Sequence, residues 1–104
     1  MTSNIFSNIP NKVPEEIFEI LASGSNVKIE RIISDGHKSD KDFWYNQEQN
    51  EFVIVLQGYA EIEFENDETI PLTKGNYLNI PAHKKHRVNY TSLNEKTIWL
   101  AVYY

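Results

Sequence analysis

The sequence lacks cysteine, which excludes disulfide bridges, thiol nucleophiles and thiolate-bound metals. It also lacks any apolar run close to the roughly 18 residues that a membrane-spanning helix requires. The first eight residues have neither the basic start nor the apolar stretch of a secretion signal. We therefore expect a cytoplasmic protein with no membrane partner.

Positive charge is scarce as well. Ten basic and fifteen acidic side chains give a formal net charge of −5. This charge repels phosphate backbones, and no stripe of lysine or arginine is long enough to overcome the repulsion. The charge balance therefore predicts that nucleic acid is not a partner. The length of 104 residues suits a single domain.

What the sequence does contain is a series of short apolar segments separated by turn residues. Residues 51–56 form a largely apolar, β-branched run of strand length, which ends at Gln57-Gly58. In residues 60–65, apolar side chains alternate with glutamates, as in a strand with one face in solvent. Many short strands with turns about ten residues apart favour an antiparallel all-β sandwich or barrel. Further strands are predicted at 77–80, 87–90 and 97–103.

The beginning of the chain has a different character. Residues 1–25 are expected to form an N-terminal arm, because Pro10 and Pro14 argue against a continuous helix there. Within this arm, residues 14–22 fit either a short helical turn or an edge strand. Residues 26–104 are expected to form one β-barrel domain.

Two motif-like spacings connect the predicted strands. Glu51 and Gly58 are separated by six residues, and Gly75, Pro81 and His86 follow in the pattern G-x5-P-x4-H. With both patterns in this order, residues 26–103 resemble the cupin superfamily, whose motifs are G-x5-H-x-H-x3,4-E-x6-G and G-x5-P-x-G-x2-H-x3-N. The resemblance implies a jelly-roll barrel of the cupin type, also called a double-stranded β-helix. This fold hosts many functions, so the resemblance is more specific for fold than for activity.

The resemblance is incomplete at the paired histidines of the first motif. Tyr45 and Gln47 stand at these positions, or Trp44 and Asn46 if the longer spacing applies. We prefer the first register because one uninterrupted strand would aim Tyr45, Gln47 and Glu51 in the same direction.

A metal site follows from the resemblance, since cupins with the full motif bind a divalent ion through three histidines and one glutamate. The corresponding ligands here would be Gln47, Glu51 and His86, and the ion Zn, Mn, Ni or Fe. In an enzyme, Glu51 or His86 would act as the base, or the metal as a Lewis acid. In the second motif, His83 replaces the glycine and is a possible fourth ligand, and Tyr90 replaces the asparagine.

A small-molecule ligand is expected at the mouth of the barrel, a common place for binding sites. The basic run from His83 to Arg87 predicts that this ligand carries a carboxylate or a phosphate, because local positive potential concentrates anions. The resemblance allows isomerisation, decarboxylation or dioxygenation. The side chains expected to bind the ligand are Tyr45, Arg31, His83, Tyr90 and Trp99.

Each interpretation has a plainer alternative. Glu51 could pair with Arg31 in a buried ion pair that needs no metal. The basic run could be a solvated loop, and Trp99 could be a core aromatic. The loss of both motif histidines also fits a non-catalytic sensor or assembly module. Apolar side chains in the arm and in residues 99–104 offer a surface for a second copy, so we expect a homodimer.

Overall fold

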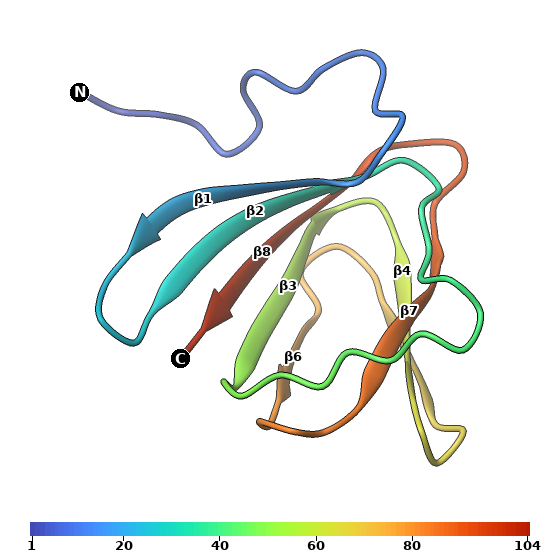
Figure 1. Ribbon diagram of the computed structural model, residues 1–104. Coiled ribbons are helices and arrows are strands. Elements are labelled where there is room, and N and C mark those ends of the chain that lie inside the picture. Colours follow the sequence, from blue (N-terminus) through green and yellow to red (C-terminus); the bar gives the residue numbers. More distant parts are fainter.

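Two antiparallel sheets form the structure, a computed structural model that describes residues 1–104 (Figure 1). The larger sheet has the strand order β1 (Ile17–Ser23), β2 (Lys28–Ser34), β8 (Thr97–Tyr103), β3 (Glu51–Gln57) and β6 (Tyr77–Ile80). The smaller sheet has the order β5 (Thr69–Leu72), β4 (Ala60–Phe64) and β7 (His86–Thr91). The predicted all-β antiparallel fold is confirmed. No helix in the structure has the length and hydropathy needed to cross a bilayer.

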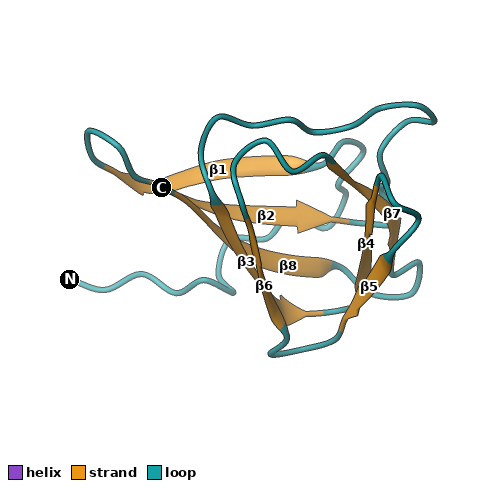
Figure 2. Cartoon of the chain, turned by 90° about the horizontal axis from the view of Figure 1, so that it is seen from below, coloured by secondary structure: helices purple, strands orange, loops and turns teal.

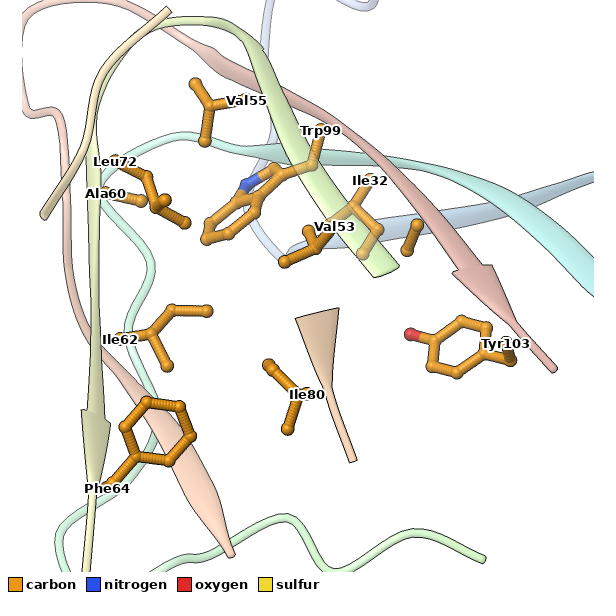
Figure 3. Packing of buried hydrophobic residues seen from close by; sticks show 11 residues of the cluster. Ile32, Val53, Val55, Ala60, Ile62, Phe64, Leu72, Ile80, Trp99 and Tyr103 are labelled. Atoms are coloured by element: carbon orange, nitrogen blue, oxygen red, sulfur yellow. The ribbon is translucent and has the colours of Figure 1, made fainter. Parts of the chain in front are cut away.

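The core lies between the two sheets, which face each other across the interior (Figure 2). Strand alternation supplies its side chains: in β3, Val53 and Val55 are almost fully buried, whereas the alternating residues Phe52 and Ile54 are partly exposed. Figure 3 shows Ile62 and Phe64 of the smaller sheet opposite Trp99 and the other side chains of the larger sheet. The core contains eleven buried residues: Ile32, Val53, Val55, Ala60, Ile62, Phe64, Leu72, Ile80, Trp99, Ala101 and Tyr103.

The N-terminal segment packs on the outer face of the larger sheet. Val13 forms a second small apolar cluster with Ile33 and Ile98, and Ile9 and Ile17 pack against this cluster. Residues 17–23 form β1, so the edge-strand alternative for residues 14–22 describes most of this segment. β1 pairs with residues 28–33 of β2, and the apolar cluster holds the segment before β1 against the outside of the sheet.

The ion pair considered for Arg31 and Glu51 is not formed, and the reason is strand alternation. Ile32 of β2 points into the core, so Arg31 points to the outer face. There its guanidinium lies 2.7 Å from the Glu19 carboxylate. It also donates hydrogen bonds to the carbonyl oxygens of Ile5 and Ser7, at 3.0 and 2.6 Å. Arg31 therefore fixes the N-terminal segment and does not reach the barrel interior.

Three positions of the cupin-like motifs have a left-handed backbone. Gly58 and Gly75 both have φ of +87°, and His83, which replaces the motif glycine, has φ of +65°. Glycine adopts this conformation freely, whereas histidine does so at some cost. At His83 the turn is held by its amide N–H, which donates to the carbonyl oxygen of Gln47 at 2.8 Å. The turn before β7 is thereby attached to the segment before β3.

Candidate functional site

A small cavity opens between the sheets, at the ends where β3 and β7 begin. Its volume is about 40 Å³. Four aromatic rings form part of its wall: Phe18, Tyr45, Trp99 and Tyr103. Four polar or charged side chains also face it: Glu16, Gln47, Glu51 and His86. Ile32, Ile62 and Val88 complete the lining.

Glu51 and His86 form a buried pair in this cavity. Each is the first residue of its strand, and they are 7% and 3% exposed. The Nε2 atom of His86 lies 3.3 Å from Oε1 of Glu51. The Nδ1 atom lies 3.0 Å from the carbonyl oxygen of Lys84, which can only accept, so Nδ1 carries a hydrogen. The Nε2 atom then faces the carboxylate of Glu51 within hydrogen-bonding distance, at the wall of the cavity.

Tyr45 and Tyr103 flank the pair as neutral phenols. Tyr45 is fixed by a backbone bridge to His86, with N···O distances of 2.7 and 3.2 Å. Its ring stacks on the imidazole at a centroid distance of 5.4 Å. Burial raises the pKa of both Tyr45 and Tyr103, and the nearby carboxylates, Glu51 among them, raise it further. Both hydroxyl groups therefore keep their hydrogens near neutral pH and can donate to a ligand oxygen.

The cavity lining includes Tyr45, Gln47 and Glu51, but these three residues do not lie on one strand. Residues 46–50 form no strand, so the predicted uninterrupted strand is wrong. The three side chains converge because Tyr45 is fixed to β7 and Glu51 begins β3. Trp44 and Asn46 do not line the cavity, in agreement with the first of the two motif registers.

Glu16 is a cavity residue that sequence reasoning missed. It precedes β1, and its carboxylate accepts a short hydrogen bond from the hydroxyl of Ser34. The same hydroxyl oxygen accepts from Nε1 of Trp99 at 3.1 Å. Burial raises the pKa of Glu16, while the Ser34 bond and the charge of His37 partly offset this effect. No motif marks Glu16, because its place depends on how the N-terminal segment crosses the barrel.

Three of the predicted ligand-binding residues lie away from the cavity. Arg31 is on the outer face of β2, as described above. His83 is exposed, and its Nδ1 lies 3.2 Å from the amide oxygen of Asn46. Tyr90 is also exposed and packs against Tyr59 at a ring distance of 5.9 Å. Of the five predicted ligand-binding residues, only Tyr45 and Trp99 line the cavity.

The basic run does not act as one cationic surface in the structure. Lys84 Nζ lies over the ring of Phe64, at 4.3 Å. Lys85 pairs with Glu65 in the turn after β4, at 3.8 Å. Arg87 pairs with Glu63 of β4, at 3.1 Å. Alternation along β7 sends Arg87 outward and His86 inward, so His86 alone of this run faces the cavity.

Comparison with known proteins agrees with this geometry. A family model described as a cupin domain matches residues 32–103. The chain belongs to the cupin family. A candidate mannose-6-phosphate isomerase from Ralstonia eutropha JMP134 is 43% identical, with a TM-score of 0.95 and coverage of 99% of this chain and 96% of that one.

Two further cupin-like structures share the fold at lower identity. A cupin superfamily protein from Desulfitobacterium hafniense is 24% identical, with a TM-score of 0.75 and coverage of 91% and 82% of the two chains. A conserved protein of unknown function from Streptococcus pyogenes is 17% identical, with a TM-score of 0.78 and coverage of 99% and 85%. No curated protein matches the sequence. These two likenesses show the fold of this cupin.

The donor set of the cavity differs from that of a metal-binding cupin. Glu51 and His86 lie side by side, and the Nδ1–H bond to the Lys84 carbonyl is the kind that orients a metal-binding imidazole. Gln47, in contrast, offers a neutral amide, and the phenol of Tyr45 resists ionisation. Nowhere do three histidine, aspartate or glutamate side chains come together as metal ligands. The residues present therefore do not fit the tight four-ligand site that the family implies.

Proposed function

We propose that this cupin binds a small polar molecule at the mouth of its barrel and moves a proton on it through the Glu51–His86 pair. The observation that carries the proposal is this buried pair at the cavity wall, in which His86 is the sole side-chain partner of Glu51. General acid–base catalysis by such a group contributes about 10²–10⁴ in rate. No step requires a metal.

The chemistry best matched to this arrangement is proton transfer at a carbon next to a carbonyl group. In a 2-hydroxy carbonyl compound the pair would take the proton from the carbon that carries the hydroxyl group and return it to the former carbonyl carbon, while the hydroxyl proton moves to the former carbonyl oxygen. Substrate and product then contain the same atoms, so that no other reactant is needed. The phenols of Tyr45 and Tyr103 would donate hydrogen bonds to the oxygen on which negative charge develops. The similarity to a candidate mannose-6-phosphate isomerase supports this class of reaction, because aldose–ketose isomerisation proceeds by such a transfer.

Proton exchange with solvent tests the proposal. The protein is incubated in D₂O with mannose 6-phosphate and a panel of free aldoses, and the signal of the hydrogen on the second carbon is followed by NMR. We expect this signal to decay for at least one compound, and the decay to slow by at least about 100-fold in Glu51→Gln and His86→Ala. His83→Asn is the control, because it changes an exposed histidine and tolerates the positive φ.

A non-catalytic sensor or assembly module is the second candidate function. It is favoured by one observation, the presence of Tyr45 and Gln47 where the family has paired histidines. Binding without any deuterium exchange across the panel would contradict the enzymatic proposal and support this one.

The metal predicted at Gln47, Glu51 and His86 stays a prediction, although the donor set supports weak binding at best. An ion bound to the folded state adds about 2.7 kcal/mol when its concentration is a hundred times the dissociation constant. A rise in melting temperature with Zn, Mn, Ni or Fe that His86→Ala abolishes would establish the site.

We also propose that the protein is a homodimer that uses the β1 edge of the larger sheet. This edge strand has unpaired backbone groups and exposes Phe18, Ile20 and Leu21, which are 48%, 58% and 45% accessible. We expect Ile20→Glu to convert the dimer to a 12.2 kDa monomer in sedimentation at micromolar concentration. Tyr77→Glu is the matched control, since Tyr77 is exposed on β6 at the opposite edge. A wild-type mass of one chain would contradict the proposal.

A further inference from the structure

The charged groups of the cavity already have partners within the protein. Glu51 lies against His86, and the carboxylate of Glu16 accepts the hydrogen bond of Ser34. Neither lysine nor arginine lines the cavity. The cavity therefore offers no unpaired cation to an anionic ligand and no unpartnered carboxylate to a cationic one.

A wider groove of about 770 Å³ adjoins the cavity. The two spaces have four wall residues in common, so a ligand in the groove can extend one end into the cavity. The shared residues are Phe18, Tyr45, Gln47 and Tyr103. The charges of the groove and its neutral polar groups together indicate which class of ligand it fits.

The groove is poorly suited to a phosphate. Lys28 is the one cation in its wall, and its Nζ atom lies 3.4 Å from the buried carboxylate of Glu30. The remaining charge in the wall is the exposed carboxylate of Glu48, which has the wrong sign. Proteins bind phosphate groups through arginine, lysine or the N-terminus of a helix, and this structure consists of strands and loops. A phosphate in the groove would meet one lysine that is already neutralised.

Neutral polar groups, in contrast, are free at the same place. The side-chain amide of Gln47 and the hydroxyl of Tyr45 are partly buried where the cavity meets the groove, and neither makes a hydrogen bond within the protein. Farther out, the hydroxyl of Ser25 and the side-chain amide of Asn26 are also without protein partners. Amides and hydroxyls can both donate and accept, which is what the hydroxyl groups of a polyol require.

Aromatic rings complete this surface. Phe18, Tyr45 and Tyr103 line both spaces. The face of an aromatic ring is negative and attracts the C–H bonds of a ligand carbon chain. A wall of rings with a few neutral polar groups is suited to an uncharged ligand that has both C–H and O–H surfaces.

We propose that the ligand of this cupin is an uncharged polyhydroxy carbonyl compound, a free aldose or ketose in its open-chain form, and not a sugar phosphate. Its hydroxyl groups bind Gln47 and the groove, and its carbonyl end enters the cavity. The cavity volume of about 40 Å³ holds roughly three water-sized groups, which is enough for one end of a chain but not for a ring. The inference rests on the proposed function and names its substrate class, because a neutral ligand leaves Glu51 and His86 free to move a proton.

Binding of unreactive polyols tests this inference separately from catalysis. Mannitol and xylitol, which lack a carbonyl group, are titrated into the ¹⁵N-labelled protein and followed by NMR, with mannitol 1-phosphate as the matched anion. Low salt is used, since weak screening favours the anion most. We expect both polyols to bind, and mannitol 1-phosphate to bind at least about tenfold more weakly than mannitol.

Three variants connect the binding to the named groups. Gln47→Leu removes the free amide and should weaken mannitol binding by roughly tenfold. Glu30→Gln leaves Lys28 without its carboxylate partner, so it should raise the affinity for mannitol 1-phosphate relative to mannitol by several-fold. Glu68→Gln changes an exposed residue away from both spaces and should leave binding unchanged.

Binding of mannitol 1-phosphate within about tenfold of mannitol, or tighter, overturns the inference, and so does the absence of binding by both polyols. Deuterium exchange on mannose 6-phosphate but on no free aldose would also overturn it, while the proposed proton transfer would stand. Polyol binding without exchange on any compound would contradict the enzymatic proposal and leave this ligand class standing.

Discussion

Replacing His86 with alanine is expected to lower the free energy of unfolding by about 3–5 kcal/mol, because it leaves the buried carboxylate of Glu51 without a partner. The substitution also removes the imidazole on which the ring of Tyr45 stacks. Urea unfolding followed by the fluorescence of Trp99 and Trp44 measures the change.

A double variant separates the two causes. In Glu51→Leu/His86→Leu both charges are replaced by apolar side chains, and the loss should be clearly smaller than in His86→Ala alone. His83→Asn, at an exposed position, should change the stability by no more than about 0.5 kcal/mol. A loss below about 1 kcal/mol for His86→Ala would contradict the view that Glu51 depends on this imidazole.

Gly58→Ala is expected to be the most damaging substitution outside the cavity. A Cβ atom at this position would lie 2.5 Å from Oγ1 of Thr97 and 2.8 Å from its Cα atom. The second contact is to backbone, so a rotation of the threonine cannot relieve it. The positive φ adds a cost of about 1 kcal/mol, and the displacement of a well-packed strand adds about 1–3 kcal/mol. Thermal unfolding should therefore show a loss of about 2–4 kcal/mol.

Gly75→Ala is the matched comparison for this prediction. Gly75 has the same φ of +87°, but no atom lies within 4 Å of the place where its Cβ would be. Its substitution should incur only the backbone cost, about 1 kcal/mol. If both variants lost the same free energy of unfolding, the contact with Thr97 would be relieved by a small shift of the backbone and would not contribute to the loss.

The fold was predictable from sequence because its signals are local. Apolar side chains alternate with glutamates in residues 60–65, and residues 51–56 form a largely apolar run; both patterns predict strands. The spacing of the motifs predicts the turns between these strands. The same spacing brought Glu51 and His86 together, since both begin strands at one end of the barrel. Tyr103 could have been found as well, because it shares its strand face with Trp99.

The remainder of the site depends on contacts that no local pattern encodes. Glu16 reaches the cavity only because the segment before β1 crosses the barrel, and its partner Ser34 lies on another strand. The apolar neighbours of Arg31 in the sequence favour an interior face and hence a pair with Glu51, whereas in the structure that face packs against the N-terminal segment. The basic run from His83 to Arg87 is contiguous in sequence, but it does not form one surface, because consecutive residues of a strand point in opposite directions.

The position of β8 has a consequence for the order in which this protein can form. It is the last of the eight strands to leave the ribosome, yet it lies between β2 and β3 and pairs with both. During synthesis β2 and β3 therefore have no stable partner on their facing edges, and Trp99 is missing from the core. Assembly of the larger sheet must wait for this strand and then close over a long sequence separation, which is a slow step. The nascent chain would expose β-rich apolar segments during this interval, so its yield in cells would depend on chaperones more than its final stability suggests.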